Sequence, residues 1–348
     1  SRTLVDYVTW AMSTYPSDKY VLILSDHGSG WPGGWSDPTS TSKTVSNLPL
    51  SSAMGDQLYL MEIDEALGQI RAQTGLDKFE VIGMDACLMS HIEVLDAMAP
   101  HARYFVGSQE TEPALGWAYA ALLTDLNNNP GMTGADLGKS IVNTYIKSDQ
   151  RIVDDAARAD FLGRGSALGG LMGSPSASDV INQLSRDITL SVVDLSAVPS
   201  VISSLNDLSF AMQSGDQRAV AQARSYAQSF TSIFGSNVPA SYIDLANFSQ
   251  LLARQTGGAV GTAANQLVAQ IDRAVVAEKH GNNKPGANGI SIYFPNSALY
   301  KTAEAGPKSY TVAAARFSQE SLWDNFLAYH YLGRSFDLSD VTTAVPGS

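Results

Sequence analysis

The chain has 348 residues and a mass of 37.0 kDa, enough for a large core, and its 44% hydrophobic and 16% charged residues are typical of a globular protein. A formal net charge of −12 argues against a nucleic-acid partner, because such a chain would repel the phosphates. The single cysteine excludes an internal disulfide framework, and no apolar run reaches the roughly 18 residues of a membrane span.

Strand and helix patterns alternate along most of the chain. Apolar residues at helical spacing predict a first helix that Pro16 ends, and continuous apolar runs predict buried strands. We expect strands at 20–25, 79–84, 104–108, 188–195 and 289–295. We expect helices near 63–70, 88–98, 118–124, 134–146, 196–234, 247–279 and 323–331. This alternation predicts an α/β fold with a mostly parallel sheet between helices.

Three stretches lack such periodicity. Residues 32–57 are rich in Gly, Ser, Thr and Pro, which predicts a long surface loop, and long loops in compact domains are usually functional or mobile. Residues from about 148 to 178 are Ala-, Gly- and Ser-rich, and we interpret them as an insertion or a mobile connection. The polar segment 337–348 is expected to lead out of a single domain that spans 1–336.

Two predicted strands end at reactive side chains. His27 follows the first strand and Cys87 follows the second, and adjacent parallel strands joined by a crossover place such ends side by side. An imidazole activates a thiol as a nucleophile. The product would be an acyl-enzyme, and its oxyanion needs N–H donors. The backbone of Gly28 could approach closely, and the N–H of Cys87 is a second candidate.

Plainer interpretations stay open for these residues. A lone cysteine can be a small core residue, and Asp85 could cap the helix that follows it. His91 is interpreted as a packed or helix-surface histidine. A competing enzyme class is an α/β-hydrolase with Asp85 as the nucleophile, although its late acid and histidine have no clear place. A non-catalytic, surface-binding relic of a peptidase fold is a third possibility.

Two blocks around these residues carry a family resemblance. Asp26–Trp31 (DHGSGW) and Gly83–Met89 (GMDACLM) resemble the two catalytic blocks of the clostripain family of cysteine peptidases (C11), in the clan that holds caspases. The segments 112–119, 190–194 and 289–295 agree with it, so the resemblance spans about residues 3–332. The family has a further strand before its first helix. This sequence begins at that helix, so we expect the strand to be absent or upstream.

The resemblance implies both fold and chemistry. It implies a caspase-like α/β/α sandwich, with His27 as general acid/base and Cys87 as nucleophile. It implies a cysteine endopeptidase that cleaves protein or peptide substrates after Arg or Lys, with Asp85 in the S1 pocket. A carboxylate there makes physical sense, because a buried guanidinium or ammonium needs a counter-charge. Glu110 and Glu112, in the loop after the third strand, are candidates for a second acid.

The predicted loop at 32–57, which follows the first block, carries a candidate cleavage site. Lys43 is the only basic residue between His27 and Arg71, and flexible polar segments are preferred nicking sites. The resemblance implies self-cleavage in the region 28–58, so we expect a monomer or a self-cleaved two-chain form. It also implies a secreted or cell-surface protein, although the given sequence shows no signal peptide.

The expected chemistry requires no cofactor. Scattered histidines and one cysteine do not make a thiolate zinc site, and no EF-hand loop is present. Calcium stays open, because some members of the family need it and the chain is rich in Asp and Asn.

Overall fold

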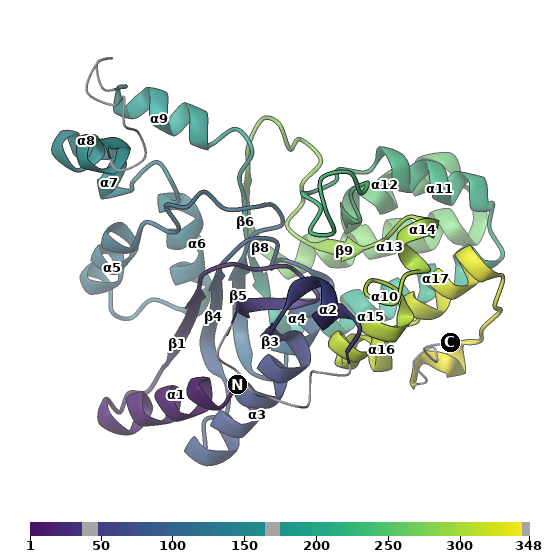
Figure 1. Cartoon of the computed structure of the whole chain (residues 1–348), viewed down its shortest axis with the longest axis horizontal. Helices are drawn as coiled ribbons and strands as arrows, with labels where there is room; N and C mark the ends of the chain where they lie inside the picture. The colour runs from purple at the N-terminus through teal and green to yellow at the C-terminus, as the bar shows by residue number, and fades with distance from the viewer. Residues whose placement is uncertain (37–47, 164–174, 343–348) are drawn as a thin grey trace.

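A five-stranded sheet forms the centre of the protein. The computed structural model describes residues 1–36, 48–163 and 175–342 (Figure 1). The strands follow the spatial order β1 (Val21–Ser25), β4 (Phe79–Asp85), β5 (Ala102–Gly107), β6 (Thr189–Asp194) and β8 (Val275–His280). β1, β4 and β5 are parallel, whereas β6 is antiparallel to both β5 and β8. Four of these five strands therefore point the same way, which confirms the mostly parallel sheet.

Helices cover both faces of this sheet. One face packs against α1 (Arg2–Thr14), α3 (Leu60–Thr74), α4 (Ile92–Met98), α10 (Val198–Gln213) and α13 (Gly258–Ala274). Further helices enlarge this layer: α11 (Gln217–Tyr226), α12 (Leu245–Gln255), α14 (Ser297–Tyr300), α15 (Pro307–Ala313), α16 (Ala315–Glu320) and α17 (Trp323–Leu332) (Figure 1). The opposite face packs against α5 (Tyr119–Asn128), α6 (Gly134–Thr144), α7 (Gln150–Val153), α8 (Asp155–Gly163) and α9 (Ala177–Leu184).

The side chains of the central strands explain the two layers. Successive residues of a strand point to opposite faces. Ile82 of β4 joins the core under the larger helical layer, and its neighbour Val81 joins the core under α5 and α6. Phe105 and Val106 of β5 divide in the same way. The apolar runs of β4 and β5 are thus strands that pack on both faces, and the fold is an α/β/α sandwich. The run at Tyr20–Ser25, which the sequence predicts to be buried, forms the edge strand β1 and is only partly buried.

Two predicted elements were placed wrongly. The stretch 289–295 does form a strand, β9 (Ser291–Tyr293), but it pairs antiparallel with β7 (Tyr242–Asp244) outside the central sheet. The fifth strand of the central sheet is β8, which we had predicted as the end of a helix at 247–279. That helix ends at Ala274. Local periodicity does not separate these cases, because Val275–His280 follows α13 without an intervening loop and is a strand only through its pairing with β6.

Several predicted loops contain short regular elements. The stretch 32–57 holds β2 (Gly33–Ser36), α2 (Leu50–Met54) and the start of β3 (Gln57–Tyr59), which pairs with β2. The described parts of 148–178 are α7, α8 and the beginning of α9, and η1 (Leu195–Ala197) and η2 (Leu338–Thr342) are 3₁₀ turns. The helix expected at 88–98 begins only at Ile92. Within the described ranges, no helix is long and apolar enough to cross a membrane.

Candidate active site

A cleft opens where β1 and β4 end. Ser25 of β1 lies in register with Asp85 of β4, and the N–H of Asp26 donates to the carbonyl oxygen of Asp85 at 3.3 Å. The cleft has a volume of about 310 Å³ and is lined by Ser25, Asp26, His27, Asp85, Ala86, Cys87, Glu112, Pro113, Ala114 and Gly116. The parallel pairing of the two strands thus brings both family-like blocks to one place.

The histidine loop, residues 26–32, presents an exposed imidazole. The side chain of His27 is 94% exposed. Its backbone is fixed, since the His27 N–H donates to Asp26 Oδ1 at 2.8 Å and its carbonyl accepts from Trp35 N–H at 3.0 Å. Among the described residues no hydrogen bond joins this imidazole to the Cys87 thiol, and catalytic hydrogen bonds are often long in the absence of substrate.

Gly28 packs directly against the nucleophile segment. A Cβ atom at this position would lie 2.4 Å from the carbonyl oxygen of Cys87 and 2.8 Å from the side chain of Met89. Only glycine fits there without a backbone shift. The residue after the histidine is therefore in van der Waals contact with the cysteine residue, which is where an oxyanion donor would be needed.

Cys87 lies in the turn between β4 and α4 and is partly buried. The N–H of Glu112 donates to its Sγ atom at 3.3 Å. Leu88, the next residue, has a φ of 65°, a left-handed conformation that costs a non-glycine residue roughly 1–2 kcal/mol. This turn directs the chain away from the sheet immediately after the thiol, so the sulfur stays at the cleft.

Asp85 forms the floor of the cleft. It is 5% exposed, and its Oδ2 atom accepts hydrogen bonds from the Trp117 N–H at 3.2 Å and the Tyr119 hydroxyl at 2.7 Å. Burial, together with the charge of Asp85, raises the pKa of Tyr119, so this hydroxyl remains a donor. Asp85 does not cap α4, which begins seven residues later at Ile92 with His91 at the cap position.

Glu112 approaches the same carboxylate from the next strand's loop. Its Oε1 accepts from Trp117 Nε1 at 3.4 Å, and the residue lines the cleft together with Asp85. Its Oε2 is shielded from solvent, although the residue as a whole is only half-buried. Burial first, and then the proximity of Asp85, raises the pKa of Glu112 well above its ordinary value. The cleft therefore holds two carboxyl groups, and the pKa of one of them, Glu112, is raised.

The structure separates Glu110 from this pair. The Glu110 side chain turns away from the cleft and forms an ion pair with Lys284 at 2.5 Å. It is 2% exposed and is absent from the cleft lining. Of the two candidate second acids, Glu112 alone reaches Asp85. Lys43 lies outside the described residues.

The remaining histidines have structural surroundings. His91 is fully buried, bonds Glu93 through Nδ1 at 3.1 Å and packs edge-on against Tyr242. His101, His280 and His330 bond Asp64, Glu278 and Gln217 respectively. In the described part of the chain, no three His, Cys, Asp or Glu side chains gather closely enough to hold a metal ion.

Tyr119 and Gly116 belong to the site although the residue-by-residue reasoning assigned them no role. Tyr119 donates to Asp85, and Gly116 has a φ of 65° with room for no Cβ, since that atom would lie 2.8 Å from Asp85 Oδ2. One indication in the sequence that segment 112–119 belongs to the site was its agreement with the family pattern.

Comparison with known proteins agrees with this architecture. The sequence pattern of the Clostripain family matches residues 1–330. No curated protein matches the chain. A secreted C11 cysteine protease from Bacteroides thetaiotaomicron, solved with an irreversible peptide inhibitor, aligns with a TM-score of 0.51 and 20% identity over 89% of this chain and 76% of its own. An inactive zymogen C11 protease from Parabacteroides distasonis aligns with a TM-score of 0.56 and 18% identity, over 94% and 75% of the two chains.

The fold and the family match define a cysteine-type peptidase, a hydrolase of peptide bonds. The chain belongs to the clostripain family. This class excludes the alternative of an α/β-hydrolase with an aspartate nucleophile, and Asp85 is in any case buried and occupied by two donors.

Proposed function

We propose that this peptidase is an endopeptidase that cleaves after Lys or Arg with Cys87 as nucleophile and His27 as general acid/base. One observation carries the proposal. A single cleft is lined by the only thiol of the chain, an exposed imidazole and two carboxyl groups, those of Asp85 and Glu112. Chemistry and charge recognition would thus be adjacent, as hydrolysis after a basic residue requires.

The proposed reaction runs through a thioester. His27 accepts the thiol proton, and the Cys87 sulfur attacks the scissile carbonyl carbon. The resulting oxyanion is held by the backbone N–H groups of Gly28 and Cys87. The carbon–nitrogen bond breaks as His27 protonates the leaving amine. A water molecule then attacks the thioester, His27 accepts its proton, and the carboxylic acid leaves while the thiol is restored.

Three features of the site support these roles. The Glu112 N–H at 3.3 Å from Sγ stabilises negative charge on the sulfur. The high exposure of His27 lets the ring turn between the thiol, the leaving amine and the incoming water. Asp85 with Glu112 supplies the counter-charge for the basic P1 side chain at the cleft floor, where a desolvated cation needs one. Glu110 has no part in this pocket, because its carboxylate is bound to Lys284.

A panel of fluorogenic peptides with Arg, Lys, Asp or Asn at P1 tests the specificity. We expect cleavage after Arg and Lys only, and turnover limited to Asp or Asn would overturn the proposal. Iodoacetamide tests the nucleophile separately, because the chain has one thiol. Stoichiometric alkylation should abolish cleavage of every substrate, and full activity of the alkylated protein would exclude Cys87.

We propose further that the enzyme processes itself after Lys43 and that the two pieces stay associated. His27, which follows β1, and Cys87, which follows β4, lie on opposite sides of this segment in sequence, and β1 and β4 are paired along their length. Mass spectrometry of active enzyme beside the Cys87→Ala variant should show cleavage at Lys43–Thr44 in the former only. An intact bond in fully active enzyme would contradict self-processing.

The setting of the enzyme is also a proposal. The Bacteroides neighbour is described as secreted, and we propose that this chain likewise acts outside the cytoplasm on protein or peptide substrates, as a monomer or a self-cleaved pair. The proposed chemistry uses no cofactor. Activity before and after treatment with EDTA and readdition of calcium decides whether the ion is required.

A further inference from the structure

The backbone that follows β5 runs alongside the nucleophile segment. We call residues 108–118 the acid loop. The Leu88 N–H donates to the Glu110 carbonyl at 3.1 Å, and the Ser90 N–H donates to the Ser108 carbonyl at 2.8 Å. The Glu112 N–H reaches Cys87 Sγ at 3.3 Å. The position of the sulfur relative to its N–H donor is therefore set by where the acid loop lies.

The first anchor of the acid loop is a buried ion pair. The Glu110 carboxylate accepts three hydrogen bonds: from the Lys284 ammonium at 2.5 Å, from the N–H of the next residue, Thr111, at 2.8 Å and from the Thr231 N–H at 3.2 Å. The side chains of Glu110 and Lys284 are 3% and 16% exposed, and Lys284 also lies over the ring of Phe230. All partners except Thr111 come from far along the chain.

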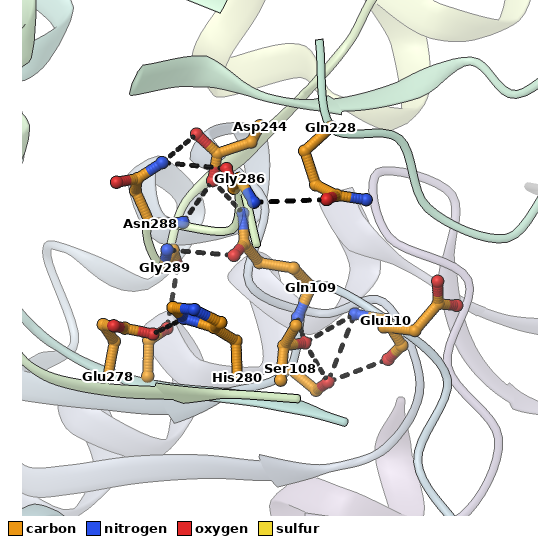
Figure 2. Close-up of polar contacts among 12 residues, drawn as sticks. Ser108, Gln109, Glu110, Gln228, Asp244, Glu278, His280, Gly286, Asn288 and Gly289 are labelled. Carbon is orange, nitrogen blue, oxygen red and sulfur yellow. Dashed lines mark hydrogen bonds and ion pairs between the residues drawn. The ribbon is translucent and has the colours of Figure 1, made fainter. Parts of the chain in front are cut away.

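The second anchor is the neighbouring glutamine (Figure 2). Gln109 donates through Nε2 to Asp244 Oδ2 at 2.9 Å and accepts from the Gly289 N–H at 2.9 Å. Asp244 also accepts from the N–H and Nδ2 of Asn288 at 2.6 and 3.0 Å. The Thr189 hydroxyl accepts from the N–H groups of both Gln109 and Glu110. The loop that carries Glu112 is thus fastened to segment 284–289 on the side away from the cleft.

A buried ion pair is an inefficient way to gain stability. Desolvation of the two charges offsets much of their attraction, and an apolar pair of similar volume often serves as well. What a charged pair with two additional N–H donors supplies is a defined geometry. The Glu110 carboxylate has one position in which all three donors reach it, and its backbone is two residues from the N–H that contacts the thiol.

We propose that Glu110 and Lys284 are positioning residues of this peptidase, and that their ion pair sets the acid loop so that the Glu112 N–H meets the Cys87 sulfur. The inference rests on the proposed role of Cys87 as nucleophile, but not on the preference for a basic P1 residue. Glu110 acts through the loop and touches neither substrate nor the reacting atoms.

The experiment compares Glu110→Gln, Lys284→Met and the double variant with the wild type. The matched control is Glu278→Gln, which removes the charge from another acid with an ion-pair partner, His280, on β8. Three quantities are measured well below the thermal midpoint: the second-order rate of Cys87 alkylation by iodoacetamide, and kcat and KM on whichever P1 substrate the wild type cleaves. Thermal midpoints are recorded for every variant.

We expect Glu110→Gln and Lys284→Met each to lower the alkylation rate and kcat by about tenfold, with KM changed less than about twofold, because small displacements of reacting groups are costly. The double variant should lose no more than either single one, since the pair acts as a unit. Lys284→Arg, which keeps the cation, should recover most of kcat. Glu278→Gln should match the wild type in all three quantities.

Two results would overturn the proposal. One is that folded Glu110→Gln or Lys284→Met keeps the wild-type alkylation rate and kcat and shows only a lower thermal midpoint. The ion pair would then stabilise the fold without positioning the acid loop. The other is an equal loss in Glu278→Gln. If iodoacetamide fails to inactivate the wild type, the role of Cys87 fails instead, and the two failures are thereby distinguished.

Discussion

The two loops that flank Cys87 are built in opposite ways. The histidine loop is fixed through its backbone and leaves the imidazole of His27 94% exposed. The acid loop buries Ser108, Gln109 and Glu110 to 2% exposure or less and ties their side chains to distant parts of the chain. The difference fits the two roles that we propose for the residues these loops carry, His27 and Glu112. A general acid/base serves several partners in turn, whereas charge recognition requires fixed, desolvated groups.

The largest loss of activity is expected when one of the two side chains proposed to react, Cys87 or His27, is removed. Cys87→Ala should lower kcat/KM by at least about 10⁴-fold and His27→Ala by about 10³–10⁴-fold, as the loss of a nucleophile or its base does elsewhere. Because the His27 side chain is so exposed, its loss should shift the thermal midpoint by no more than about 1 °C. Peptide hydrolysis and differential scanning fluorimetry measure both. A His27→Ala enzyme with a tenth or more of wild-type activity would contradict the role proposed for the histidine loop.

A smaller loss is expected when the recognition side loses its charge. Asp85→Asn keeps the shape of the cleft floor but removes the counter-charge, so kcat/KM for Lys and Arg peptides should fall by about 10²–10³-fold. Peptides with a neutral P1 residue should change less than about fivefold. Asp77→Asn is the control, because Asp77 forms an exposed ion pair with Arg103. Equal losses on basic and neutral peptides would remove Asp85 from recognition.

Contact between the two sides can be tested at Gly28. In Gly28→Ala the new Cβ would fall 2.4 Å from the Cys87 carbonyl oxygen, so the histidine loop must shift. We expect kcat to fall by about 10- to 50-fold, since misplacement of about 1 Å can cost 10²-fold. Gly131→Ala is the matched control, because its Cβ would meet nothing nearer than 3.8 Å. Unchanged kcat in Gly28→Ala would show that the two loops are independent.

The smallest expected effect concerns the proton on Glu112. Its pKa is raised well above its ordinary value, mainly by burial, so the unliganded carboxyl keeps its proton to a higher pH than a free glutamic acid does. A bound cation favours the ionised form, and binding therefore releases that proton. Affinity for benzamidine should rise with pH, by at most tenfold per unit, until the pKa of Glu112 is passed.

Calorimetry of benzamidine binding to the Cys87→Ala variant measures this affinity at each pH without interference from the thiol proposed to react. In Glu112→Gln, which mimics the protonated acid, the rise of affinity with pH should vanish. A wild-type affinity that falls as pH rises would contradict the raised pKa of Glu112.

The sequence itself determined the strands that carry the chemistry. Tyr20–Ser25 and Phe79–Asp85 are apolar runs of strand length, so their composition alone predicts them, and the residues that follow each run must lie at its carboxyl end. His27, Cys87 and Asp85 could be selected on that ground together with the family blocks. The helix–strand boundary at Ala274 and the pairing of Ser291–Tyr293 could not, because β8 and β9 are distinguished by the partner strand rather than by local pattern.

The tertiary structure alone decided which acid serves which purpose. Glu110 and Glu112 are two residues apart in a sequence that treats them alike, yet one pairs with Lys284 and the other with Asp85. Tyr119, Thr231 and Lys284 meet the site only after the chain has folded back on itself. Hydrophobic periodicity is a local property and can be read in order. The partner of a buried polar group depends on which distant segment packs against it, and that is fixed only in three dimensions.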